Sequence, residues 1–127
     1  MILPILTIAP SDNRGRGVFT TEAIEADTII EISPVLVLNP EERQKVEQTL
    51  LYDYIFEWGD DLKSCCVALG YLSVYNHSYT ANCIYEMDFE HDVMQIRTVK
   101  PVAAGEELFI NYNADPDDHK PIWFEAK

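Results

Sequence analysis

The sequence predicts a single domain that is mainly β with a few short helices, and two observations support this. First, the chain has 127 residues, 47% hydrophobic and 24% charged. One domain usually has about 100–200 residues, and this composition is that of an ordinary globular protein. Second, short β-rich segments recur between Pro, Gly, Asn and Asp residues, with no internal repeat or linker-like Gly/Ser stretch. We therefore expect one hydrophobic core.

Strands are expected wherever β-branched and aromatic residues run between turn residues. The alternation is best in 83–89, where Cys83 and Tyr85 share one face and Glu86 and Asp88 share the other. A turn at 90–92 then connects this segment to 93–99 as a hairpin. The predicted strands are Ile2–Ile8, Gly17–Thr21, Thr28–Glu31, Val35–Leu38, Leu51–Trp58, Cys83–Phe89, Val93–Val99 and Glu107–Tyr112.

One helix is predicted, over Glu41–Leu50. Asn39 can cap it, Pro40 suits the first helical position, and Glu42 completes a capping box. The segment Cys65–Tyr75 is ambiguous, because its periodicity does not decide between strand and helix. A short helix over Leu62–Val74 is the weaker second prediction.

The chain is strongly acidic, with 9 Lys and Arg against 22 Asp and Glu and a formal net charge of −13. Most of its surface would repel a nucleic-acid backbone and attract a basic partner. Acidity that only maintains solubility is the alternative. Charge alone names no substrate.

Cysteine usage and hydropathy indicate the compartment. The chain has three cysteines, Cys65, Cys66 and Cys83, and no CxxC pair. No apolar stretch approaches the roughly 18 residues that cross a bilayer, and residues 1–9 do not resemble a signal peptide. We expect free thiols and an intracellular location, cytoplasmic or nuclear.

Three polar clusters are candidate sites. They are Arg14-Gly15-Arg16-Gly17, Asn76-His77-Ser78 with Asn82, and Gly105-Glu106-Glu107-Leu108 leading to Tyr112. Glycines let a backbone approach a ligand closely, but a turn before a strand also requires them. An Asn-His-Ser triplet can equally be a hydrogen-bonded structural turn. A tyrosine hydroxyl at a strand end can orient a nucleophile.

Three other kinds of site fit poorly. A Ser/His/Asp hydrolase lacks its Gly-x-Ser-x-Gly elbow. The cysteines and histidines lack paired zinc-ligand spacing, so no metal is expected. The acidic run 115–118 lacks the Gly and distal Glu of a calcium loop.

The order of the three clusters resembles the SET-domain family of protein-lysine methyltransferases. That family has a Gly-x-Gly turn after the first strands, an Asn-His-Ser-x-x-x-Asn segment, and a closing Glu-Leu-x-x-x-Tyr motif. The matching segments are Gly15–Phe19, Asn76–Asn82 and Gly105–Tyr112, so the resemblance spans roughly residues 10–113. It implies a β-fold of small curved sheets, in which the Asn-His-Ser segment passes beneath a loop to form a C-terminal pseudoknot.

The resemblance also implies a cofactor, S-adenosyl-L-methionine. Arg16, Gly17, Asn76 and His77 would line its cleft. Tyr112 would lie beside the methyl sulfonium and align the lysine amine as the catalytic residue, by orientation and electrostatic support rather than covalent attack.

The target lysine would enter a narrow channel from the opposite side. Because it must be neutral to attack, an aromatic channel beside a positive sulfonium would lower its pKa without a dedicated base. Tyr54 and Tyr75 are the predicted channel walls, chosen from the aromatic residues Tyr52, Tyr54, Phe56, Tyr71 and Tyr75.

The chain departs from the family pattern near its end. Many relatives close the cofactor cleft with a cysteine cluster that binds zinc, and place a cysteine after Asn-His-Ser, where this chain has Tyr79. We expect a SET domain over 1–113 and a tail over 114–127 that closes the cleft, with Trp123 and Phe124 stacking on the adenine. Packing of this pair on the core is the alternative.

The predicted function is S-adenosylmethionine-dependent methylation of a lysine in a basic protein segment, such as a histone-like tail. A non-catalytic SET-fold module that binds a basic peptide is the alternative, because fold alone does not fix function. A methyltransferase for a small amine or a non-histone target is a third interpretation. The partners expected are a basic protein or peptide, no nucleic acid, no membrane, and a possible second copy of the chain.

Overall fold

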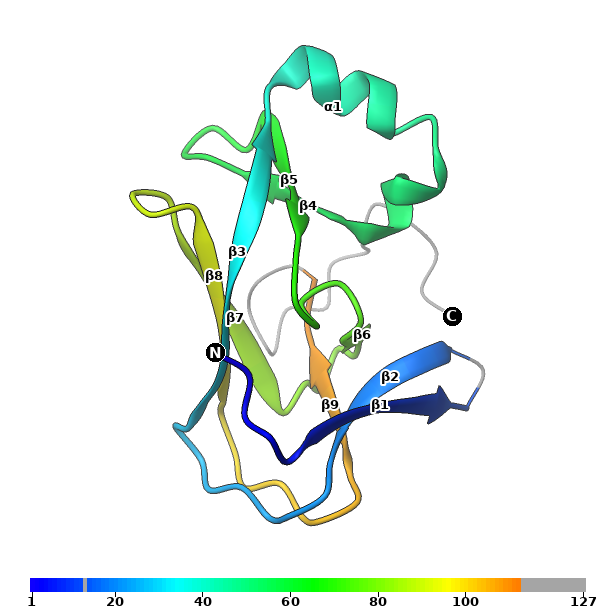
Figure 1. Cartoon of the computed structure of the whole chain (residues 1–127), viewed down its shortest axis with the longest axis vertical. Helices are drawn as coiled ribbons and strands as arrows, with labels where there is room; N and C mark the ends of the chain where they lie inside the picture. Colours follow the sequence, from blue (N-terminus) through cyan, green and yellow to red (C-terminus); the bar gives the residue numbers. More distant parts are fainter. Residues whose placement is uncertain (13, 113–127) are drawn as a thin grey trace.

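The computed structural model describes residues 1–12 and 14–112, which form two β-sheets (Figure 1). In chain order the elements are β1 (Leu6–Ser11), β2 (Gly15–Thr20), β3 (Ile29–Leu38), α1 (Pro40–Val46), the 3₁₀-helix η1 (Leu50–Tyr54), β4 (Ile55–Trp58), β5 (Ser64–Ala68), β6 (Asn76–His77), β7 (Cys83–Asp88), β8 (Val93–Thr98) and β9 (Glu107–Ile110). The predicted mainly β fold is confirmed.

The larger sheet has the strand order β4-β5-β3-β8-β7, with every neighbouring pair antiparallel. Its central strand β3 is continuous, although the sequence predicts two separate strands, Thr28–Glu31 and Val35–Leu38. Residues 29–34 pair with β8, and residues 35–38 pair with β5. Pro34 therefore lies where β3 changes partners, and the N–H that it lacks interrupts neither ladder.

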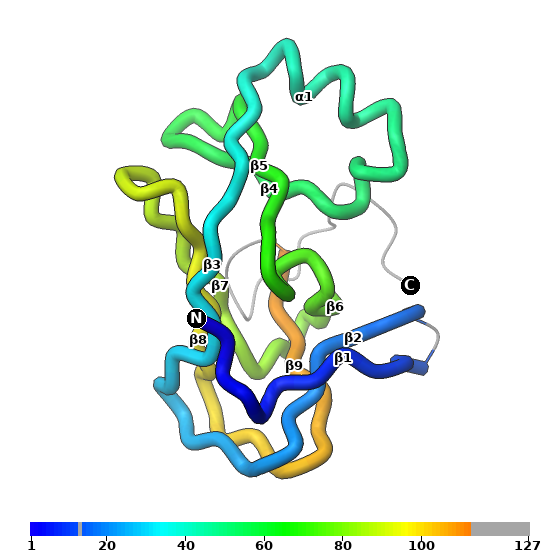
Figure 2. Tube along the Cα trace, in the orientation of Figure 1, coloured from blue at the N-terminus to red at the C-terminus, as the bar shows by residue number. Residues whose placement is uncertain are grey.

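The smaller sheet has the order β1-β2-β9-β6 and contains a parallel pair, β6 with β9. Strand β6 follows β5 in the chain, but β5 belongs to the larger sheet and β6 to the smaller one. Figure 2 shows β6 beside β9, although residues 78–106, which include β7 and β8, lie between them in the sequence. This crossing brings the second polar cluster of the sequence against the third.

The helix begins as predicted and ends early. The Asn39 side chain accepts a hydrogen bond from the Glu42 N–H, and the Glu42 side chain accepts one from the Asn39 N–H, so the capping box is present. The helix ends at Val46, before the expected Leu50. Residues 51–54, for which the sequence predicts a strand, belong to η1 together with Leu50, because Thr49 caps a 3₁₀ turn there.

The weaker helix predicted over Leu62–Val74 is wrong. Residues 64–68 form β5, which pairs with both β3 and β4. Gly70 then adopts a left-handed φ of +63° in the turn that follows. The periodicity of residues 64–68 favours neither strand nor helix, and hydrogen bonding to a strand on each side makes this segment a strand.

One hydrophobic core joins the two sheets. Ile30, Met94 and Ile96 come from the larger sheet, and Val18 and Ile110 from the smaller one; all five are fully buried. The alternation expected in β7 is confirmed: Cys83 and Tyr85 are buried, and its turn with β8 covers residues 89–92. None of the helices described is long and apolar enough to span a membrane.

Candidate functional site

The second and third polar clusters are joined by backbone and side-chain hydrogen bonds. His77 pairs with Ile110 in the parallel β6–β9 ladder. The Asn82 side chain donates to the carbonyl of Glu107 at 2.9 Å and accepts from the N–H of Phe109 at 2.8 Å. Asn82 thus bonds two backbone groups of β9 beside its pairing with β6, and it helps to fix the register of the two segments.

The first cluster is attached to the others by the Asn76 side chain, which also binds the Glu107 carboxylate. Glu107 Oε2 accepts from Asn76 Nδ2 at 2.7 Å, and Glu107 Oε1 accepts from Ser11 Oγ at 2.6 Å. Asn76 Nδ2 also donates to the carbonyl of Arg16 at 2.9 Å. A Cβ on Gly17 would lie closer than 3.0 Å to the Glu107 carboxylate and to Asn76 Nδ2. Only glycine fits against this pair.

We expect Gly17→Ala to lower the free energy of unfolding by about 1–3 kcal/mol, because the added methyl group forces the Glu107 carboxylate away from Asn76. Urea unfolding measures this cost. The control is the same substitution in a Glu107→Ala background, which removes the two Glu107 atoms that the methyl group meets and leaves Asn76 Nδ2. The cost should shrink there by at least about 0.5 kcal/mol. An equal cost in both backgrounds would show that the contact is not the cause.

His77 is buried, with 6% of its surface exposed, and only one of its ring nitrogens has a partner among the described residues. Nδ1 accepts from the N–H of Tyr112 at 3.1 Å, so in the neutral ring the proton lies on Nε2. Burial, with a smaller effect of Arg14, lowers the pKa of His77 and favours the neutral form. Nε2–H is then a buried donor for which residues 1–12 and 14–112 supply no acceptor.

Tyr112 directly follows β9 and Asn111, and hydrogen bonds hold it at three points. Its N–H donates to His77, its carbonyl accepts from the Tyr85 hydroxyl at 3.0 Å, and its own hydroxyl donates to the carbonyl of Tyr75 at 2.6 Å. The ring of Phe56 lies edge-on at 6.1 Å between centroids. Tyr112 therefore presents one defined hydroxyl position.

Burial is the main reason that the pKa of Tyr112 is raised, and the nearby Tyr54 and Asp53 raise it further. The hydroxyl therefore keeps its proton at neutral pH. A protonated phenol can donate one hydrogen bond and still accept another. Such a group suits the orientation of a substrate better than removal of a proton.

The structure brings most of the predicted site residues together. Arg16 and Gly17 lie in β2, Asn76 and His77 in β6, and Tyr112 after β9; the contacts above join them. Trp123 and Phe124, like the rest of the tail 113–127, lie outside the described residues.

The two predicted channel residues occupy different environments. Tyr54 is 41% exposed on η1 and near enough to Tyr112 to raise its pKa. Tyr75 is fully buried; its hydroxyl donates to Glu31 Oε1 at 2.8 Å, and its carbonyl meets the Tyr112 hydroxyl. Their role as channel walls stays a prediction.

Two carboxylates were not among the predicted site residues. Glu107 was noted only as part of a motif, although its side chain joins two clusters. Glu31 was read as a strand residue, but its side chain is fully buried. A charged residue between Ile30 and Ile32 in an apolar run was the available signal, because a buried charge needs partners.

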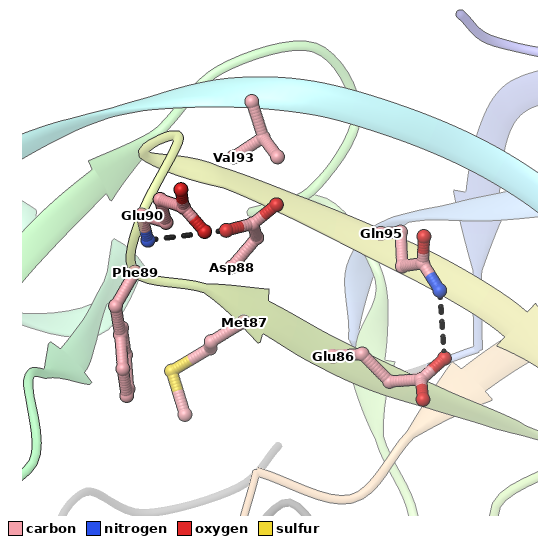
Figure 3. A pocket seen from close by; sticks show the side chains of 7 residues that line it. All are labelled: Glu86, Met87, Asp88, Phe89, Glu90, Val93 and Gln95. Atoms are coloured by element: carbon pink, nitrogen blue, oxygen red, sulfur yellow. Dashed lines mark hydrogen bonds between the residues drawn. The ribbon is translucent and has the colours of Figure 1, made fainter.

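A surface groove of about 460 Å³ lies elsewhere, on the β7–β8 hairpin (Figure 3). Its acidic residues are largely paired: Glu86 accepts from Gln95 and Arg97, and Asp88 accepts from His91. It contains none of the predicted site residues. In the part of the chain that the structure describes, no three His, Cys, Asp or Glu side chains gather as metal ligands.

Comparison with known proteins agrees with this geometry. The SET domain family model matches residues 15–113. The chain is 36% identical over 121 residues to a Schizosaccharomyces pombe protein named "Histone-lysine N-methyltransferase, H3 lysine-37 specific", and the match covers 94% of this chain and 77% of that protein.

Two solved structures are similar. The crystal structure of a Plasmodium falciparum histone methyltransferase superposes with a TM-score of 0.68 at 27% identity, covering 98% of this chain and 100% of that one. The ctPRC2 complex, in an autoinhibited conformation bound to S-adenosylmethionine, superposes with a TM-score of 0.71 at 20% identity, covering 87% of this chain and 15% of that one; it shows the fold alone. From the motif order, the β6–β9 crossing and these matches, we conclude that the chain belongs to the SET-domain family.

Proposed function

We propose that this chain transfers a methyl group from S-adenosylmethionine to the side-chain amine of a lysine in a basic protein segment. The observation that carries the proposal is the fixed Tyr112 side chain after β9: its hydroxyl donates to the Tyr75 carbonyl, and its backbone N–H and carbonyl are bonded to His77 and Tyr85. The S. pombe relative is named for this activity. Retention of Asn76, His77 and Tyr112 in one connected site supports an enzyme over a module that only binds.

The residues at the β2–β6 junction fit the cofactor. The buried Nε2–H of His77 needs an acceptor, and S-adenosylmethionine carries a carboxylate, ring nitrogens and hydroxyl groups. Gly17 has no side chain, so the backbone of β2 stays accessible beside Asn76. We assign cofactor binding to Arg16, Gly17, Asn76, His77 and Tyr112; Trp123 and Phe124 of the tail complete the predicted set.

When bound, S-adenosylmethionine would supply an electrophilic methyl group, so that the N–C bond to the neutral lysine amine forms as the S–C bond breaks and S-adenosylhomocysteine leaves. Tyr112 acts by position: its hydroxyl donates to the Tyr75 carbonyl, which aims the phenolic oxygen so that it can accept from the lysine N–H. The amine lone pair is then directed away from Tyr112. After transfer the nitrogen releases its extra proton to solvent, so no buried base is required.

The lysine channel is assigned to Tyr54 and Tyr75, as the sequence analysis proposed. Tyr54 on η1 is partly exposed and near Tyr112, which suits the channel mouth. Tyr75 contributes the backbone carbonyl that orients Tyr112. An aromatic, poorly hydrated channel lowers the pKa of the entering lysine and favours the neutral amine.

The proposed substrate is a histone-like basic segment. A net charge of −13 attracts such a segment and raises its association rate. The S. pombe relative is named as specific for lysine 37 of histone H3. We further propose an intracellular site of action, nuclear or cytoplasmic, and a second copy of the chain as a candidate partner.

The melting temperature with and without cofactor tests the proposal. Saturation at a hundredfold excess over Kd should add about 2.7 kcal/mol of stability, because the ligand binds only the folded chain. S-adenosylhomocysteine should reproduce the shift, and mass spectrometry should then detect methyl groups on the lysines of a basic peptide. A shift without methylation would favour the non-catalytic module. No shift with either compound would refute the methyltransferase proposal.

A further inference from the structure

Glu31 is a fully buried carboxylate that the mechanism above does not use. Its Oε2 accepts from Ser33 Oγ at 2.7 Å and from the N–H of Tyr71 at 2.8 Å, and its Oε1 accepts from the Tyr75 hydroxyl at 2.8 Å. Burying a charged group costs several kcal/mol unless its hydrogen bonds are satisfied. A carboxylate kept here at that cost requires an explanation beyond packing.

Two of the three partners of Glu31, Tyr71 and Tyr75, lie at the two ends of one turn, residues 71–75, which leads into β6. Gly70 enters this turn with a φ of +63°, and a Cβ there would collide with Glu31 Oε2 and Ser33 Oγ. The turn therefore rests directly on the Glu31 carboxylate. The carboxylate accepts a hydrogen bond from the backbone N–H of Tyr71, the first residue of the turn, and one from the hydroxyl of Tyr75, the last.

The last residue of this turn is also the partner of Tyr112. The Tyr75 hydroxyl points to Glu31, whereas the Tyr75 carbonyl accepts from the Tyr112 hydroxyl at 2.6 Å. Burial and the neighbouring Glu31 raise the pKa of Tyr75 well above its ordinary value, so its hydroxyl remains a donor at working pH. The contacts run without a gap from Glu31 through Tyr75 to Tyr112.

We propose that Glu31 is a positioning residue for methyl transfer, which sets the Tyr112 hydroxyl by holding Tyr75 and the turn before β6. This inference rests on the proposed function. In the proposed mechanism, Glu31 contacts neither the substrate nor the cofactor. Its effect should therefore fall on kcat and leave both KM values unchanged.

Glu31→Gln is the first test. The amide keeps the shape of the side chain but replaces one acceptor with a donor, so at least one of the three hydrogen bonds is lost or must reverse its direction. We expect kcat to fall roughly ten- to hundredfold, because small displacements of an orienting group cost that much. The KM for peptide and the Kd for S-adenosylmethionine should each change less than about twofold, which is well below the tenfold change that corresponds to about 1.4 kcal/mol.

Tyr75→Phe is the second variant, in case Glu31→Gln does not fold. It removes only the hydroxyl that reaches Glu31 and keeps the carbonyl that reaches Tyr112. It should reproduce the fall in kcat, and the double variant should lose no more than Glu31→Gln alone. Thr98→Val is the matched control, because it removes another fully buried hydroxyl, at the end of β8, which donates to the Glu25 carbonyl and accepts from the Thr28 N–H but bonds to none of Glu31, Tyr75 and Tyr112. It should lower stability and keep kcat.

A readout without turnover separates this inference from the proposed function. In protein with ¹³C-labelled tyrosine, the Tyr112 ring resonance, identified by its loss in Tyr112→Phe, should shift in Glu31→Gln and Tyr75→Phe but not in Thr98→Val. A wild-type chain that methylates nothing refutes the proposed function, whereas an unmoved Tyr112 resonance refutes the role of Glu31. Unchanged kcat in both variants, or a fall that only follows their loss of stability, also overturns it.

Discussion

Replacing Tyr112 with phenylalanine should reduce kcat for lysine methylation by roughly 10²–10³-fold, the cost of removing one preorganised hydrogen-bonding group at a reacting centre. The substitution deletes one oxygen and keeps the ring that lies against Phe56. It also keeps the backbone bonds from Tyr112 to His77 and Tyr85, because neither uses the hydroxyl. Folding and cofactor affinity should therefore persist.

Steady-state kinetics with a lysine peptide, together with calorimetric titration of S-adenosylmethionine, measure both halves of this prediction. Tyr85→Phe is the matched comparison, since it removes one buried hydroxyl that contacts the main chain of Tyr112 rather than its phenol. Its effect on kcat should be less than about tenfold, near the ~1 kcal/mol of an ordinary hydrogen bond. Equal activity of Tyr112→Phe and wild type would remove Tyr112 from the mechanism.

Replacing His77 with alanine should destabilise the fold and weaken cofactor binding together. The change leaves the Tyr112 N–H without its acceptor and opens a hole beside the ring of Tyr79, whose centroid lies 4.3 Å from that of His77. A lost buried hydrogen bond and a cavity of this kind together cost about 2–4 kcal/mol. Cofactor affinity should fall because the Nε2–H donor is lost.

Urea unfolding and cofactor titration provide the two measurements. His91→Ala is the control, because His91 is 67% exposed in the β7–β8 turn and surface substitutions usually change stability by less than about 0.5 kcal/mol. His77→Asn, which restores a short polar acceptor, should recover part of the stability. If His77→Ala were as stable as His91→Ala, the Tyr112 N–H bond would not matter to the fold.

The features that the sequence predicted correctly are the ones with short-range causes. The capping box at Asn39 and Glu42 depends on residues three positions apart, and the β7–β8 alternation depends on a period of two. Two of the wrong assignments have long-range causes. The strand at 64–68 exists because two other strands pair with it, and β3 is continuous because its partner changes at Pro34.

The same division holds for the site. Local motifs identified Gly17, Asn76, His77 and Tyr112, because their residue types and spacings are visible within a few positions of the chain. Trp123 and Phe124, which lie outside the described residues, stay a prediction. Asn76 and Glu107, in contrast, meet only because β6 pairs with β9, which is about 30 residues further along the chain.

By itself the sequence determined the fold class and the family resemblance, and it predicted Tyr112 as the orienting tyrosine. Only the tertiary structure decided what holds that tyrosine in place. Glu31 is 44 residues from Tyr75, and Tyr75 is 37 residues from Tyr112, so no local pattern connects them. A hydrogen-bond network in the core is set by the packing of distant strands, whereas a motif is set by neighbours in the chain.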